Sequence, residues 1–224
     1  MLTYKQRLEL LNDTSDTVWN SIDKPMRRLI FEMNRTGLIT RFCCFGMPYG
    51  EDDEPKSHAD NNPYVFFQMT EQGYKNWNIA SKILNDEQKY FEKGVLSLHK
   101  FANVFSLFFK DQLPHNFYIS DDMIAIHKYE AYVLQIQNLT VVLQSLPGTN
   151  IVKIVDGNRN YSNIEMWQID PKPDFIISVD EFYEKYGKLT NSHENVFSEF
   201  NCIPVDEFNI NKFGIVERTQ NAEV

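Results

Sequence analysis

The chain has 224 residues, of which 42% are hydrophobic and 14% aromatic, enough for one large domain with a packed core. Its net charge of −9 repels nucleic acid and excludes a strongly basic class of nucleic-acid-binding protein. Three cysteines do not make a disulfide framework, and we find neither a secretory leader nor a long apolar run, so we expect a cytoplasmic protein without membrane contact.

The stretch 25–69 predicts a helix, a strand, a long loop and a second strand. Pro25 suits the first turn of the helix, and Gly37 suits the left-handed position that often follows the last turn. Residues 38–45 and 63–69 are rich in β-branched and aromatic side chains, which favours strands. The nearest basic cluster belongs to the helix and is expected to form a solvated face; it consists of Lys24, Arg27 and Arg28.

The middle of the chain predicts further helices. Thr70 is the expected N-cap of a helix over 70–84. Phe and Leu side chains recur with helical spacing over 85–112, which predicts a helix packed into the core. Residues 116–129 predict strands, and residues 130–146 predict a helix closed by a Pro-Gly pair.

The C-terminal part predicts a hairpin over 150–170 and a short helix over 179–187 with Asp180 as its cap. Together these elements predict an α+β fold in which helices pack on one side of a mixed or mostly antiparallel sheet. We expect one core domain, residues 1–188, followed by an irregular C-terminal segment, residues 189–224.

The run MNRTGLITRFCCFG, the loop after it and PYVFFQM resemble a motif of uncharacterised phage and bacterial proteins. That motif has a helix, a Gly, a strand ending in Cys-x-Gly, a loop and a second strand. A more distant similarity is to the cysteine-containing strand of the tRNA wybutosine-synthesis methyltransferase family. The phage-type motif usually has a Ser before the Cys and a His after the Gly. Cys43 and Met47 stand at these positions here, so the resemblance implies no shared ligand or cofactor site.

Cys44 lies at the end of the first predicted strand, where functional groups often occur. A nucleophilic thiol needs a nearby base or cation, and His58 and Arg41 are the candidates near it in the sequence. This set defines one alternative, a small-molecule or nucleotide-processing enzyme. We favour the simpler interpretation, in which Cys43 and Cys44 pack as small apolar side chains.

A second alternative is a zinc-stabilised interaction module, with ligands from Cys43, Cys44, His58 and Cys202. The closely spaced ligand pairs of structural zinc sites are missing, so we predict no metal and no cofactor.

Two loops carry groups suited to binding. The first contains an acidic run, Glu51, Asp52, Asp53 and Glu54, and the second offers Arg159 for a phosphate or carboxylate. Hydrolase, P-loop and dinucleotide-binding motifs are absent from the sequence. We therefore predict a non-enzymatic acidic binding protein, in the manner of a phage accessory protein that binds or inhibits a host macromolecule, such as a host protein, in the host cytoplasm.

Overall fold

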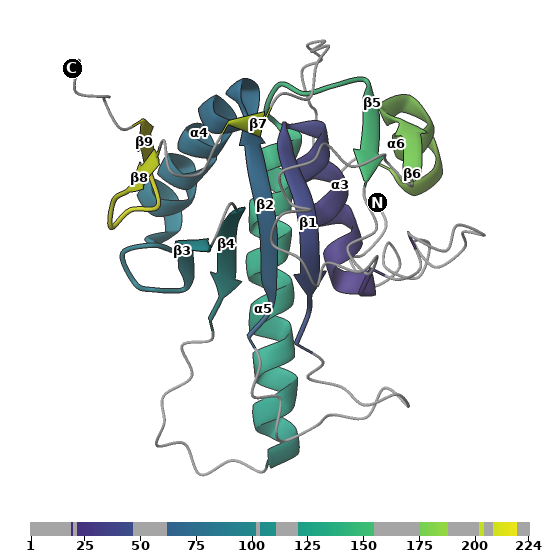
Figure 1. Ribbon diagram of the computed structural model, residues 1–224. Coiled ribbons are helices and arrows are strands. Elements are labelled where there is room, and N and C mark those ends of the chain that lie inside the picture. The colour runs from purple at the N-terminus through teal and green to yellow at the C-terminus, as the bar shows by residue number, and fades with distance from the viewer. Residues whose placement is uncertain are drawn as a thin grey trace, which may run out of the picture.

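The computed structural model describes residues 19, 22–46, 62–101, 104–110, 121–154, 175–187, 202–203 and 208–218. These residues form an α+β fold in which helices cover one face of an antiparallel sheet, as predicted (Figure 1). None of the helices in these ranges is long and apolar enough to cross a membrane.

The main sheet has its strands in the order β1-β2-β4-β3, and all neighbours are antiparallel. The strands are β1 (Leu38–Cys44), β2 (Tyr64–Thr70), β3 (Leu96–Phe101) and β4 (Val104–Phe109). A short strand, β7 (Cys202–Ile203), pairs with the end of β2 at Met69 and Thr70. The predictions of β1 and β2 are confirmed.

The first predicted helix is confirmed as the 3-10 turn η1 (Lys24–Met26) followed by α3 (Arg27–Arg35). Every residue of α3 is buried, so the expected solvated basic face is wrong for Arg27 and Arg28, whereas Lys24 is exposed. The Nε of Arg27 donates to the carbonyl of Ile22 at 2.8 Å, and the two Nη atoms of Arg28 donate to the carbonyls of Tyr186 and Gly187. These arginines satisfy backbone carbonyls instead of facing solvent.

Gly37 connects α3 to β1 with a φ of +87°, as its position after the helix predicted. A Cβ atom here would lie 2.3 Å from Thr70 Oγ1 and 2.8 Å from the Gly73 nitrogen. The carbonyl of Gly37 accepts the backbone N–H of Thr70 at 2.9 Å. Only glycine therefore allows the end of α3 to lie against the start of the next helix.

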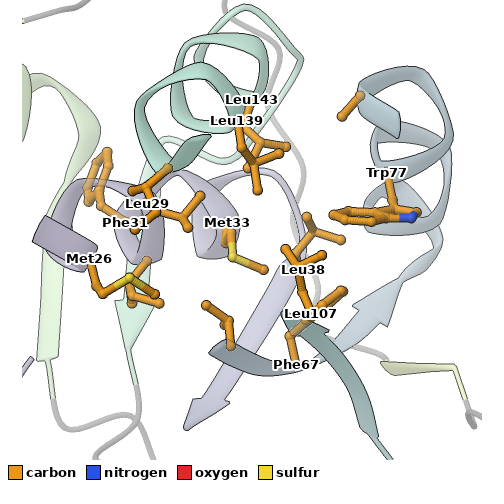
Figure 2. Close-up of a cluster of buried hydrophobic side chains, with 14 of the residues drawn as sticks. Met26, Leu29, Phe31, Met33, Leu38, Phe67, Trp77, Leu107, Leu139 and Leu143 are labelled. Carbon is orange, nitrogen blue, oxygen red and sulfur yellow. The ribbon is translucent and has the colours of Figure 1, made fainter. Parts of the chain in front are cut away.

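That next helix is α4 (Glu71–Gln88), and Thr70 caps it by accepting the N–H of Gly73 at 3.0 Å, as predicted. The longest helix is α5 (Asp121–Gln144), which runs behind the sheet. Figure 2 shows the core between these layers, where Met33, Leu38, Phe67, Trp77 and Leu139 come together from five elements.

The predicted helix over 85–112 is wrong beyond residue 88, because that stretch forms the hairpin of β3 and β4. Leu96 and Leu98 are buried on β3, as are Phe105, Leu107 and Phe109 on β4. This alternation fits a strand period of two. The predicted strands over 116–129 are also wrong from residue 121 onward, because α5 begins there; the helix over 130–146 is confirmed.

A second small sheet pairs β5 (Ile151–Ile154) with β6 (Phe175–Ser178). The strand at β5 is confirmed, whereas the rest of the hairpin predicted over 150–170 lies outside the described residues. The following helix, α6 (Val179–Tyr186), is capped by Ser178, whose Oγ accepts the N–H of Glu181; Asp180 lies within the first turn instead. Helix α6 packs on α3 through stacked Phe31 and Phe182 rings.

The segment 189–224 is not irregular throughout, because it contributes β7, β8 (Phe208–Ile210) and β9 (Val216–Arg218). Trp77 on α4 donates from Nε1 to the carbonyl of Gly214 at 2.7 Å. Asn78 bonds to both backbone groups of Val216, which fixes the β8–β9 hairpin on α4.

Candidate functional site

One face of the main sheet carries no described helix, and we call it the open face after its exposed end at Phe101; Arg41, Gln68 and Ser106 on the same face are buried. Val65, Phe67 and Met69 of β2 are buried in the core. Because side chains alternate along a strand, Tyr64 and Phe66 point to the opposite side. Helices α3 and α5 lie behind the sheet in Figure 1, and Trp77 of α4 packs on Phe67, so the three helices share the core side.

Five rings form a continuous aromatic cluster on the open face. Phe66 is its centre, with ring centroids 5.2 Å from Tyr64, 5.6 Å from Phe101, 6.4 Å from Phe42 and 6.5 Å from Phe108. The Phe101 side is the most open, with that residue 58% exposed, while the other four rings are half-buried. Aromatic pairs at these separations are favourable contacts, so the cluster is ordered.

A β-bulge in β1 places Arg41 beside this cluster. The register runs Thr40 opposite Phe67 and then Phe42 opposite Phe66, which leaves Arg41 as the extra residue. Thr40 faces the helices, because its Oγ1 accepts Asn34 Nδ2 at 2.7 Å. Arg41 donates from Nε to Gln68 Oε1 at 2.7 Å and from Nη2 to the same oxygen. The bulge therefore gives the open face a guanidinium next to aromatic rings.

The four strands around Arg41 lack acidic residues, although the chain as a whole is acidic. Arg41 is only 5% exposed, and the four strands of the sheet contain no Asp or Glu. Gln68 supplies a neutral oxygen, so it orients the guanidinium without neutralising it. A buried charge is usually paired with an opposite one, and this cation instead has an amide as its partner among the described residues.

The two cysteines point to opposite sides of β1. Cys43 packs against the core, and burial raises the pKa of its thiol well above the ordinary value. Cys44 is half-buried, opposite Tyr64, and accepts the Gly46 N–H at 3.3 Å. Burial raises the pKa of Cys44 as well, and the Asp23 carboxylate adds to this effect. Both thiols therefore stay protonated near neutral pH.

Two of the three residues in the catalytic set proposed from the sequence, Cys44 and Arg41, are described by the structure. Arg41 bonds to Gln68 instead of lowering the pKa of Cys44, and His58 lies outside the described residues. Two of the four zinc ligands proposed from the sequence, Cys44 and Cys202, lie far apart. Cys44 lies opposite Tyr64 at one end of β2 and Cys202 opposite Thr70 at the other, about 20 Å apart at the usual rise of a strand. Within the described ranges, no three His, Cys, Asp or Glu side chains lie close enough together to hold a metal ion.

The predicted binding residues of the two loops, Glu51, Asp52, Asp53, Glu54 and Arg159, lie outside the described residues. Asp23 is the N-cap residue of η1 but makes no side-chain capping bond; its carboxylate accepts the backbone N–H of Phe45 at 2.7 Å. This bond ties the start of η1 to the end of β1, close to Cys44.

Sequence reasoning missed the aromatic cluster, although a signal was present. The strand PYVFFQM has large apolar side chains on both faces, whereas a strand with one solvated face alternates apolar and polar residues. The chain matches no protein-family model, no curated protein and no solved structure.

Proposed function

We propose that the chain is a non-enzymatic binding protein and that the open face of its main sheet binds a partner protein. The observation that carries this proposal is the aromatic cluster around Phe66 on a face without a described helix. Aromatic side chains and arginine are enriched at the centres of protein interfaces, where charged residues such as Lys, Glu and Asp are depleted. The open face has this composition.

A protein fits this surface better than nucleic acid does. A groove for single strands combines stacking rings with several cations that follow the phosphates. The four strands contain only two such cations, Arg41 and Lys100, and the chain as a whole carries a charge of −9. We infer that direct nucleic-acid binding plays no part. The resemblance to phage proteins extends the proposal to a phage accessory protein that acts on a host protein in the cytoplasm.

The acidic run Glu51, Asp52, Asp53 and Glu54 is a second candidate surface for the same function. It would attract a basic partner, and complex formation through it would weaken as salt screens the charges. Binding through the aromatic cluster depends on burial of apolar surface and should change little with salt.

The enzyme alternative is less well supported. A nucleophilic cysteine needs a lowered pKa, and the pKa of Cys44 is raised by burial. The zinc alternative is weakened because Cys202 and Cys44 lie at opposite ends of β2.

The test uses two exposed apolar residues, Phe101 in the cluster and Ile79 on α4, which are 58% and 46% exposed. Immobilised wild-type chain, Phe101→Asp and Ile79→Asp are incubated with cell lysate from the natural source, and bound proteins are identified by mass spectrometry. We expect a stoichiometric partner on wild type and Ile79→Asp and its loss on Phe101→Asp.

If Phe101→Asp retains the partner, the open face is not the binding surface. A third variant with Glu51→Gln, Asp52→Asn, Asp53→Asn and Glu54→Gln, tested at low and high salt, then shows whether the acidic run binds the partner. Circular dichroism melts of all variants exclude loss through unfolding.

A further inference from the structure

We propose that the outer edge of β3 pairs with β3 of a second copy of the chain, which joins two main sheets into one continuous sheet. Strand β3 is the last strand at one end of the main sheet and pairs only with β4 among the described strands (Figure 1). An exposed strand edge carries unpaired N–H and C=O groups and is a template for a further strand. This inference concerns the edge of the sheet, whereas the proposed function concerns its face.

The hydrogen bonds of β3 show which of its backbone groups point outward. The N–H of Lys110 donates to the carbonyl of Val95 at 2.8 Å, so these two residues are a hydrogen-bonded pair of the ladder with β4. Such pairs alternate along an antiparallel ladder, and the residues between them turn their backbone groups away from the partner strand. In β3 these outward residues are Leu96, Leu98 and Lys100.

Leu98 and Lys100 leave their outward groups without a bond. The N–H of Leu96 donates to the carbonyl of Tyr90 at 3.1 Å, but no residue in the described ranges bonds to the outward N–H or C=O of Leu98 or Lys100. Leu98 is buried through its side chain, which packs in the core. His99, Lys100 and Phe101 are exposed, so a strand can approach the edge here.

These groups select one register for two antiparallel copies. Opposite residues exchange both bonds only where both point outward, so Leu98 faces Lys100 of the second copy, and His99 faces its own copy on the two-fold axis. The pairing makes four backbone bonds. A register centred on Leu98 would place Lys100 opposite Leu96, whose N–H is already bonded to Tyr90. A register centred on Lys100 would place two like charges opposite each other.

The side chains of the open face fit this register. Phe101 lies opposite Ser97 of the second copy, and Ser97 is itself the partner of Phe108 across β3 and β4. The small Ser97 side chain leaves room for the Phe101 ring beside Phe108 of the second copy, a favourable aromatic contact. The pairing therefore gives the 58% exposed Phe101 a neighbour and joins the aromatic clusters of the two chains. Strands β3 and β4 contain no Asp or Glu that would repel its copy.

The first test measures the mass of the full chain in solution. Five residues from each chain form the strand contact, against about 20–30 a side in a standard interface, so we expect a weak dimer. Sedimentation velocity at physiological ionic strength, with up to about 1 mM chain, should show a monomer–dimer equilibrium. A monomer at every concentration, or larger aggregates without a dimer, overturns the proposal.

Lys100→Pro removes one outward N–H and no bond of the ladder with β4, because the N–H of Lys100 points away from β4. The dimer then loses two of its four backbone bonds, one at each copy, so its Kd should rise about thirtyfold. Lys100→Ala removes the same charge and keeps the N–H, so its Kd should stay within about threefold of wild type. Equal Kd values for the two variants, with both folded by circular dichroism, overturn the proposal.

Disulfide formation tests the register without a proline. His99 and its copy form a non-hydrogen-bonded pair, whose Cα atoms lie about 4.5 Å apart, a distance that a disulfide spans. Under mild oxidation His99→Cys should therefore give linked chains on a non-reducing gel. In Lys100→Cys the two Cα atoms would lie about 8–9 Å apart, too far for a disulfide, so linkage should stay at the wild-type background. No linkage in His99→Cys, or equal linkage in both variants, overturns the proposal.

The failure of this proposal can be distinguished from the failure of the proposed function. A monomeric wild type that still captures a partner protein through Phe101 removes only the dimer. Retention of the partner by Phe101→Asp removes only the open face as its binding surface, because the tests of the dimer at His99 and Lys100 leave Phe101 in place.

Discussion

Arg35 donates from Nε to Oε2 of Glu32 across 2.6 Å, and both side chains are buried, at 4% and 0% exposure. Tyr183 donates to the other oxygen of Glu32 at 2.9 Å, and Arg35 Nη2 reaches the carbonyls at the end of α5. The polar residues of α3 therefore join α5 and α6 to the centre of the fold. This explains how a helix with five polar or charged side chains is buried along its whole length.

Replacing Glu32 by Ala leaves the guanidinium of Arg35 buried without its carboxylate. We expect the free energy of unfolding to fall by about 3–5 kcal/mol, the usual cost of breaking a buried ion pair. Urea denaturation measures this loss. Glu71→Ala is the control, because Glu71 pairs with Arg218 on the surface and its removal should cost under about 1 kcal/mol. Similar losses for both variants would show that the pair is not structurally important.

Gly37→Ala should destabilise the fold more than Gly94→Ala. Both glycines have a positive φ, at +87° and +70°, so each substitution carries a backbone cost of about 1 kcal/mol. Only at Gly37 would the new Cβ also collide with Thr70 and the Gly73 backbone, whereas nothing lies within 4 Å at Gly94. The difference in melting temperature between the two variants measures the cost of the collision at Gly37. Equal melting temperatures would contradict such a cost.

The buried thiol of Cys43 should make stability depend on alkaline pH. Its pKa is 9.0 in an ordinary environment and is raised by burial in the fold. Above pH 9.0 the unfolded chain loses this proton while the folded chain retains it, so stability falls as pH rises from there toward the raised pKa. We expect Cys43→Ala to reduce the slope of unfolding free energy against pH by up to about 1.4 kcal/mol per unit. An unchanged slope would mean that Cys43 titrates normally.

The rates at which iodoacetamide alkylates Cys43 and Cys44 at neutral pH should show that neither thiol is activated as a catalytic cysteine is. Because burial raises both pKa values, Cys44 should react more slowly than free cysteine, and Cys43 should react only when urea unfolds the chain. Mass spectrometry of peptides from timed samples gives both rates. Reaction of Cys44 faster than free cysteine would restore the enzyme alternative.

Much of the first half of the fold could be predicted because its signals are local. Gly37 and Thr70 mark the end of one helix and the start of another by the conformation and hydrogen bonds of neighbouring residues. The β3–β4 hairpin was missed because its Phe and Leu side chains fit a helical period as well as a strand period. Tertiary pairing with β2 decides between the two, and it lies outside any local window.

The candidate site was predicted less well, for a related reason. The cluster joins Phe42, Tyr64, Phe101 and Phe108 from all four strands, so it depends on strand order and register. The role of Arg41 depends on a bulge that its sequence neighbourhood does not signal. The solvated face expected at Arg28 was wrong because its carbonyl acceptors are 158 and 159 residues away.

These long-range bonds also govern how the chain matures during its synthesis. Helix α3 leaves the ribosome early, yet the carbonyls that receive Arg35 and Arg28 come from residues 143–146 and 186–187. Until those residues emerge, both guanidinium groups must remain hydrated, because burying them without acceptors is costly. We therefore expect α3 to complete its packing only after these residues have been translated, a period in which chaperones protect apolar segments from aggregation.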